Sequence, residues 1–318
     1  MKLTERNDIL KIIRIFIIVL SVVSIGCMPI KTNAAKSGNV DSKSVNSSSK
    51  PVLALSILPQ DYFASRIGGD LVETLVLVGP GQSPHNYEPS PRQMADLAKA
   101  HAWILSGTEF EISLRPKIED LFPNLLLIDG TRGVSFRSME EHEDEDDDGD
   151  RSGIDRHTWL GLEPAKIMAF HIRDALCAAD SSNAAIYQEN CESLIHDMEK
   201  QFESLRNELA PLKGKTVFVY HPAFGYFLDD FDIRQEAVET GGREPTPRQL
   251  GVLIGKAKAE NVKVIFVQAQ FPVESARTAA RAAGAELVSL DPLAGDWLAN
   301  IKVMGEALAR SVQTGGNP

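Results

Sequence analysis

Three side chains with metal-binding chemistry follow predicted strands. His85 lies in the loop after one apolar run, while His221 and Asp291 come directly after two others. In open α/β sheets, ligands bind outside the carboxyl ends of the strands, so we expect these three side chains to face a common crevice. His157 lies at the end of a long polar segment, just before Trp159, where the chain re-enters the predicted fold.

Three imidazoles and one carboxylate form a four-coordinate donor set that suits Zn²⁺. Mn²⁺ would prefer more oxygen ligands, and Cu(I) would prefer sulfur. The four residues are spread over most of the chain, so there is no compact metal motif such as HExxH. A single histidine at a strand end is more often a surface or capping residue, and only the whole set indicates a site. The other four histidines have no comparable placement: His101, His142, His171 and His196.

The elements that would position these residues alternate along the chain from Pro51 onward. Short runs that are apolar throughout, alternating with helical patterns, predict parallel sheets covered on both faces. The predicted strands are 52–56, 71–78, 102–106, 125–129, 216–220, 233–239, 262–268 and 286–290. The predicted helices are 60–68, 91–100, 163–178, 182–209, 247–260, 273–283 and 295–312.

This pattern predicts an α/β protein of two lobes, each a mainly parallel sheet flanked by helices. We expect an N-terminal lobe over 51–180, which includes an acidic loop at 137–156, and a C-terminal lobe over 211–318. One long, rigid helix over 181–210 would join them, and the metal site would lie in the cleft between the lobes.

The negative charge of the chain is concentrated in one segment. The formal net charge is −11, which disfavours nucleic acid as a partner. Nine acidic residues lie within eleven positions, and without them the chain carries only −2. These residues are Glu140, Glu141, Glu143, Asp144, Glu145, Asp146, Asp147, Asp148 and Asp150.

Residues 1–35 are predicted to be an export signal. Basic residues precede an apolar run of about 12 residues, which suits a signal-peptide core and is too short for a membrane helix. Ser24–Cys27 resembles a bacterial lipoprotein box, in which Cys27 would carry lipid; ordinary cleavage after Ala34 is the alternative. Residues 36–50 are rich in Ser, Asn and Lys, which is typical of a flexible tether.

Two cysteines remain for the exported protein, Cys177 and Cys191. In an oxidising compartment they would pair as a disulfide or remain as two buried thiols. The sequence leaves both alternatives open, because it does not provide the geometry that a disulfide requires.

Four segments resemble the metal-ligand motifs of one transport family. Ser83–Pro91, Asp155–Leu160, Tyr220–Tyr226 and Leu290–Ala294 resemble those of the zinc and manganese ABC-transporter solute-binding proteins, cluster A-I, of the zinc-uptake type. The second motif more often reads Asp-Pro-His-x-Trp-Leu-Asp-Pro, from which Arg156 departs. Manganese-type members tend to carry Glu at the third ligand position, where this chain has His221.

The resemblance implies a monomeric binding protein in the periplasm or on the outer face of the cytoplasmic membrane. It would bind a metal ion between the lobes, with His85 and His157 on one side and His221 and Asp291 on the other. The ion would be Zn²⁺, with Mn²⁺ or Fe²⁺ as the alternative, and it would be delivered to a membrane permease. A lipid at Cys27 would be the only membrane attachment.

The resemblance leaves the acidic loop and two rival functions to be weighed. Zinc-type members usually have a His-rich charged loop, whereas the acidic loop of this chain contains only one histidine, His142. We expect this loop to attract cations weakly or to be merely a solvated surface loop. A periplasmic zinc hydrolase is disfavoured because four protein ligands leave no open position for water, and we expect no enzyme activity. An adhesin would fit the tether but would leave the metal site without a purpose.

Overall fold

We describe the protein from a computed structural model, which describes residues 50–139, 153–237, 246–268, 270 and 273–313. The described residues all belong to one compact unit. The predicted signal peptide with Cys27, the tether up to residue 49 and the acidic run 140–150 lie outside the described residues. Among the helices that are described, none has both the length and the apolar character of a membrane span.

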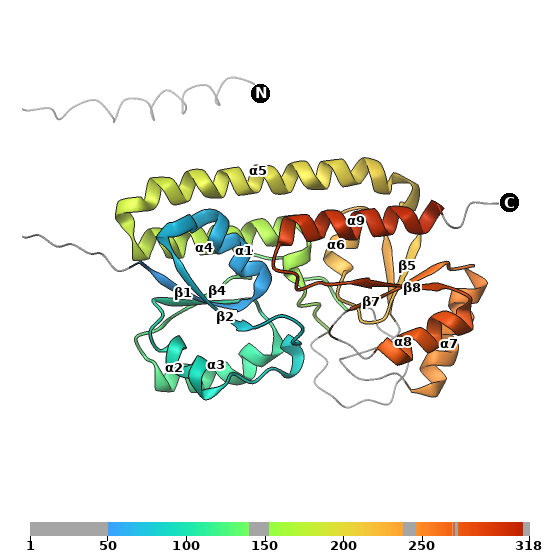
Figure 1. Cartoon of the computed structure of the whole chain (residues 1–318), viewed down its shortest axis with the longest axis horizontal. Coiled ribbons are helices and arrows are strands. Elements are labelled where there is room, and N and C mark those ends of the chain that lie inside the picture. Colours follow the sequence, from blue (N-terminus) through green and yellow to red (C-terminus); the bar gives the residue numbers. More distant parts are fainter. Residues whose placement is uncertain (1–49, 140–152, 238–245, 269, 271–272, 314–318) are drawn as a thin grey trace, which may run out of the picture. The chain divides into compact units, whose positions relative to one another are not determined.

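Two four-stranded parallel sheets form the centres of the two lobes (Figure 1). Their strand orders, β2-β1-β3-β4 and β6-β5-β7-β8, follow the same topology. The first sheet comprises β1 Val52–Ile57, β2 Glu73–Val78, β3 Ala102–Leu105 and β4 Leu126–Asp129. The second comprises β5 Thr216–Val219, β6 Arg234–Ala237, β7 Val264–Gln268 and β8 Glu286–Leu290. All strand pairs are parallel, so their carboxyl ends lie at one edge of each sheet.

Helices cover both faces of each sheet (Figure 1). The helices are α1 Leu58–Gly68, α2 Pro91–Leu97, α3 Glu109–Leu121, α4 Leu162–Ala179, α5 Ala184–Leu209, α6 Gly225–Asp229, α7 Pro247–Ala259, α8 Val273–Ala283 and α9 Trp297–Gln313. On β5, Val217 and Val219 join a large core shared by both lobes, whereas Phe218, with Tyr220 just after the strand, joins a smaller core under α7 and α8. Side chains that alternate in this way are expected for a strand buried on both faces.

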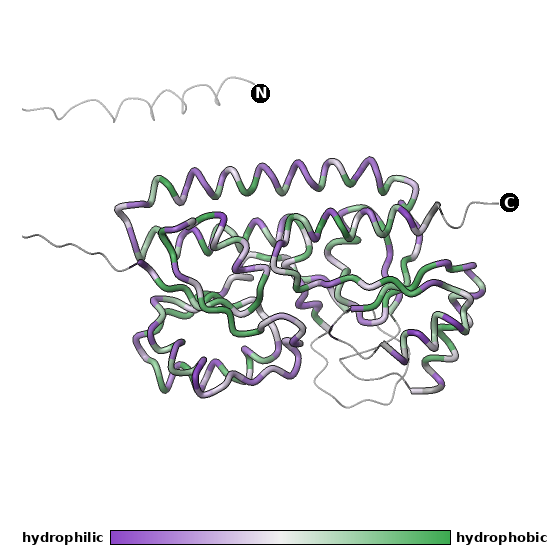
Figure 2. The backbone as a smooth tube through the Cα atoms, in the orientation of Figure 1, coloured by the Kyte–Doolittle hydropathy of each residue, from purple (hydrophilic) through white to green (hydrophobic). Residues whose placement is uncertain are grey.

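Helix α5 packs against both lobes along a single apolar stripe. It contacts α1 and α4 of the first lobe and α9 of the second. Figure 2 shows hydrophobic and hydrophilic residues alternating along this helix, as expected for a helix with one solvated face. The buried residues recur every three or four positions: Tyr187, Cys191, Leu194, Met198, Phe202, Leu205 and Leu209.

The structure confirms the predicted fold class of two parallel-sheet lobes with one long helix. Two elements were not predicted. Helix α3 lies where the sequence analysis assigned no element, because Pro116 interrupts its pattern, Ile112 is 55% exposed and Glu111 is buried. Helix α6 has only five residues, too few to show a helical period.

The structure resolves the alternatives for the two cysteines. Cys177 and Cys191 are free thiols. Cys191 is fully buried on α5, and burial raises its pKa to about 11. Such a thiol stays protonated at neutral pH, which makes it a poor metal ligand and a poor nucleophile.

Phe202 is expected to be a major contributor to stability. Its ring is fully buried and packs against the rings of Phe227, Phe231 and Trp297. Replacing Phe202 by Ala should lower the free energy of unfolding in urea by about 3–5 kcal/mol, because a cavity remains at the joint between the lobes. The matched control is Ile186→Ala on the same helix, which is 45% exposed and should cost under about 0.5 kcal/mol. Equal losses in the two variants would contradict the packing described for α5.

Asp230 should make stability depend on pH. Burial raises its pKa to about 6, although the carboxylate accepts a hydrogen bond from the Leu162 N–H at the start of α4. The folded protein therefore holds this proton more tightly than the unfolded chain. The resulting stabilisation is complete below about pH 4 and is lost as the pH rises through 6.

Asp230→Asn retains an acceptor for the Leu162 N–H and carries no charge. It should match the parent near pH 3 and exceed it at pH 7.5 by about 1–2 kcal/mol, a value reduced for the partial exposure of the group. Urea unfolding of both proteins at the two pH values measures this. A variant that is less stable than the parent at pH 7.5 would show that the carboxylate is stabilising in its charged form.

Candidate metal centre

Three of the four predicted ligands meet at one point. His85 lies in a short 3-10 turn, Pro84–Asn86, His157 immediately precedes another, and His221 follows β5. The Nε2 atom of His221 lies 3.0 Å from that of His85 and 3.3 Å from that of His157. Among the described residues, this trio is the group of His, Cys, Asp or Glu side chains that could hold a metal ion, with ligand atoms within 4.8 Å of one another.

The spacing of the ring nitrogens suits one small ion. Nitrogens about 2.0–2.1 Å from a tetrahedral Zn²⁺ lie about 3.3 Å apart, close to both observed separations. The rings of His85 and His157 are inclined at 74° and 77° to that of His221, so the three imidazoles approach the point from different directions. His157 and His221 are buried, and His85 is half-buried.

Two carboxylates orient the rings from behind. Oε2 of Glu109 lies 3.1 Å from Nδ1 of His85, and Oδ1 of Asp155 lies 2.8 Å from Nδ1 of His157. An ionised carboxylate only accepts, so each Nδ1 is the donor and each Nε2 presents its lone pair to the centre. The sequence analysis named neither carboxylate. Asp155 could have been found from its place two residues before His157, whereas Glu109 begins α3, a helix that was not predicted.

The protonation states favour metal binding at neutral pH. Burial alone would raise the pKa of Glu109, but the hydrogen bond with His85 lowers it to about 2. The pKa of Asp155 is likewise lowered, because contacts with His157 and Arg137 outweigh its burial. Burial, reinforced by the two neighbouring imidazoles, lowers the pKa of His221 well below its usual range. His221 is therefore neutral, as a ligand must be.

The fourth predicted ligand, Asp291, does not join this trio. Its Oδ1 atom accepts hydrogen bonds from Nε2 of Gln270 at 2.6 Å and from the N–H of Leu293 at 3.0 Å. Gln270 and Leu293 line the same hollow as the histidines, so the carboxylate is held beside the centre.

Two buried tryptophans tie the lobes together next to the histidines. Nε1 of Trp159, two residues after His157, donates to the carbonyl of Pro292 at 2.7 Å. Nε1 of Trp297 donates in return to the carbonyl of Trp159 at 2.7 Å. Both indoles are almost completely buried. These reciprocal bonds fix the His157 segment of the first lobe to the second lobe.

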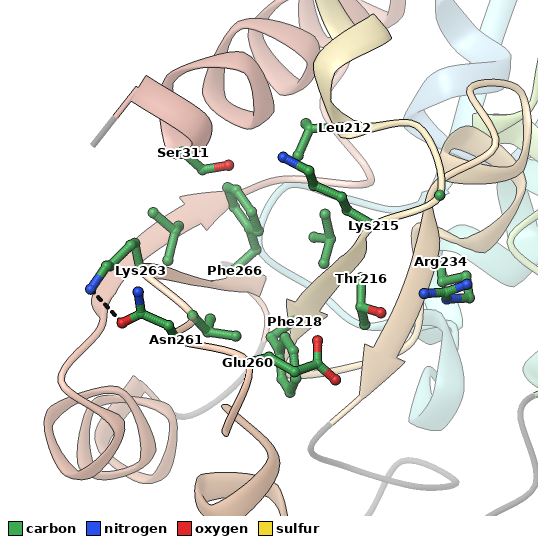
Figure 3. Close-up of a pocket in the computed structure, with 14 residues that line it drawn as sticks. Leu212, Lys215, Thr216, Phe218, Arg234, Glu260, Asn261, Lys263, Phe266 and Ser311 are labelled. Atoms are coloured by element: carbon green, nitrogen blue, oxygen red, sulfur yellow. Dashed lines mark hydrogen bonds between the residues drawn. The ribbon is translucent and has the colours of Figure 1, made fainter. Parts of the chain in front are cut away.

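The hollow at the histidines is small, about 20 Å³. It has room for an ion or a water molecule and excludes an organic substrate. A larger cavity of about 690 Å³ lies at the other end of the second sheet, near the amino ends of β5 and β7 (Figure 3). The charged residues in its lining are Lys215, Arg234, Lys263 and Glu260. Since basic side chains outnumber the single carboxylate, the cavity is positively charged, which disfavours a metal ion. The donor set for a cation is at the histidines.

Comparison with known proteins gives one family and several relatives. A family model described as "ZnuA: Zinc-uptake complex component A periplasmic" matches residues 53–311. The zinc-binding lipoprotein AdcA of Streptococcus pneumoniae is 25% identical over 249 residues, which cover 76% of this chain and 50% of the relative. The chain thus spans about half the length of that curated relative.

Solved structures share the fold over nearly their whole length. The crystal structure of ZnuA is 34% identical, with a TM-score of 0.76, and the match covers 82% of this chain and 99% of that one. The solute-binding protein FpvC of Pseudomonas aeruginosa, solved in complex with Mn²⁺, is 24% identical with a TM-score of 0.73 and coverages of 84% and 100%. At that identity FpvC supports the fold alone.

Proposed function

The chain belongs to the family of periplasmic zinc-uptake components, and we propose that it captures Zn²⁺ outside the cytoplasm for an ABC importer. The observation that carries this proposal is the convergence of three imidazole Nε2 atoms in a hollow of ionic size. The ion is the cargo of the protein, to be delivered to a membrane permease. The description of the family as a periplasmic transport component supports this role.

We assign His85, His157 and His221 as ligands, with Asp291 as the fourth. The carboxylate would have to leave its hydrogen bond with Gln270, which borders the same hollow, to reach the ion. Three nitrogens and one oxygen favour Zn²⁺ over Mn²⁺, which prefers oxygen-rich sites. The streptococcal relative is named as a zinc-binding lipoprotein, which supports the same choice, and Mn²⁺ is the alternative.

Release of the ion would require only a local change. The lobes share a large core, α5 and the two indole hydrogen bonds of Trp159 to Pro292 and of Trp297 to Trp159, which together oppose a wide opening. We propose that docking on the permease moves the His157 side of the site. The protein would act as a monomer outside the cytoplasm, and the lipoprotein name of the relative supports a lipid at Cys27.

A zinc hydrolase is the rival from another class. A hydrolytic zinc needs an open position for water, which the site would have if Asp291 did not ligate. The hollow of about 20 Å³ leaves no room for an organic substrate beside the ion. The absence of ester or peptide hydrolysis by the zinc-loaded protein would count against this rival.

Metal analysis of untagged protein should find one Zn²⁺ per chain. Substitution of a residue that orients a metal ligand typically lowers metal affinity by about 10- to 100-fold. Loss of a direct ligand should lower it further, so His221→Ala should weaken zinc binding by at least about 100-fold. Competitive titration with Zn²⁺ and Mn²⁺ against a chromophoric chelator measures both. The control is His196→Ala, an exposed histidine on α5, which should bind like the parent. Zinc affinity that is equal in all three proteins would disprove the proposed site.

Asp291→Asn separates ligation from structure at the fourth position. Asparagine retains an oxygen acceptor for Gln270 and Leu293, so the melting temperature of the apo-protein should hardly change. Loss of the charged ligand should weaken zinc by about 10-fold or more. Parent-like affinity in this variant would leave a three-histidine site and revive the hydrolase alternative.

A further inference from the structure

Arg137 connects the carboxylate behind His157 to the opposite lobe. Its Nη1 donates to Oδ2 of Asp155 at 2.8 Å, and its Nε donates to Oδ2 of Asp229 at 2.9 Å. Asp229 ends α6, which follows His221 in the second lobe. One guanidinium therefore joins the carboxylate behind one proposed ligand to the helix that follows another.

Arg137 fixes the position of a carboxylate that has no contact with solvent. The side chain of Asp155 is fully buried and uses both oxygens: Oδ1 accepts from the ring and the backbone N–H of His157, and Oδ2 accepts from Arg137. A buried carboxylate needs a hydrogen-bonded cation to compensate its lost hydration. Without Arg137, Oδ2 would lose the hydrogen bond that fixes the carboxylate. The ring of His157, which is bound to Oδ1 of the same carboxylate, would then be oriented less firmly.

The guanidinium packs directly against the backbone of the second lobe. A Cβ atom placed on Gly225, the first residue of α6, would lie 1.7 Å from Nη1 of Arg137 and 2.8 Å from Oδ2 of Asp155. The hydroxyl of Tyr226 donates to the carbonyl of Asp155 at 2.9 Å and accepts from the N–H of Arg137 at 3.1 Å. The start of α6 thus binds Arg137 and Asp155 together, and any side chain at position 225 would displace the guanidinium.

Arg137 and Asp155 also face each other across a short antiparallel stem. Ser138 forms a β-bridge with Ile154, and the N–H of Asp155 donates to the carbonyl of Arg137 at 3.0 Å. The stem therefore holds the pair at a fixed separation before either side chain reaches the second lobe.

We propose that Arg137 is a positioning residue for metal capture, which makes ligation by His157 depend on the contact between its segment and α6. This inference rests on the proposed function. Arg137 does not touch the ion. It orients His157 through Asp155, and it joins that ligand to α6, the helix that begins four residues after His221.

The two ion pairs of Arg137 should contribute unequally. The pair with Asp229 is partly solvated, since that carboxylate side chain is 55% exposed, so its loss should change zinc affinity by less than about five-fold. The pair with Asp155 is buried and lies directly behind a ligand, where substitutions typically cost about 10- to 100-fold in affinity.

The test compares four variants of the full chain with the parent: Arg137→Met, Arg137→Lys, Asp229→Asn and, as a control, Arg66→Met. Arg66 pairs with Asp197 at 2.6 Å and lies on α1, outside the proposed site. Zinc affinity and the zinc dissociation rate are measured by chelator competition. The visible spectrum of the Co²⁺-loaded protein reports ligand geometry, and the melting temperature of the apo-protein reports the fold.

Arg137→Met should bind zinc about 10- to 100-fold more weakly, release it faster and alter the Co²⁺ spectrum. Arg137→Lys, which retains a cation for Asp155, should recover most of the affinity, and Asp229→Asn should stay within about five-fold of the parent. Arg66→Met should lower the melting temperature without changing affinity.

If Arg137→Met fails to fold, Tyr226→Phe replaces it. That change removes only the bridging hydroxyl and should weaken zinc binding by about 3- to 10-fold.

Parent-like zinc binding in Arg137→Met, or in its substitute Tyr226→Phe, would overturn the inference. So would a loss in Arg66→Met equal to that in Arg137→Met, because affinity would then follow general stability. Both outcomes differ from failure of the proposed function, in which the parent itself binds no stoichiometric zinc.

Discussion

The structure around the site depends on hydrogen bonds between carboxylates and imidazole Nδ1 atoms. Glu109 and Asp155 accept from His85 and His157, and each bond directs the opposite ring nitrogen toward the centre. A carboxylate as deeply buried as Asp155 is tolerated only where its charge and both oxygens are satisfied. That requirement accounts for the position of Arg137, and through it for the contact between the stem and α6.

Because the buried charge of Asp155 is compensated by Arg137, which also bonds to the second lobe, the geometry of the site depends on both lobes. His157 belongs to the first lobe, yet its support reaches Asp229 and Tyr226 of the second, and the adjacent tryptophan donates to Pro292. A single core extends across both sheets and α5. This arrangement is consistent with the proposed local release of the ion, because a wide hinge would have to break many buried contacts together.

The two ends of the second sheet differ in charge and in room. At the carboxyl ends, three imidazoles and the side chains of Gln268 and Gln270 border a hollow that admits little more than an ion. At the amino ends, lysine and arginine side chains surround a much larger cavity (Figure 3). Cavity size alone would point to the amino ends, whereas donor chemistry favours the carboxyl ends as the place for a cation.

The sequence by itself determined the alternation of strands and helices, and the places of His85 and His221 after strands, because strand ends of one parallel sheet share an edge. It also supplied the motifs that identify the family. It did not reveal α3 with Glu109, because Pro116, exposed Ile112 and buried Glu111 hide the helical period. Only the tertiary structure decided that Asp291 bonds to Gln270 and that Arg137 meets Asp229, 92 residues away. Such contacts depend on the packing of whole lobes, which no local pattern encodes.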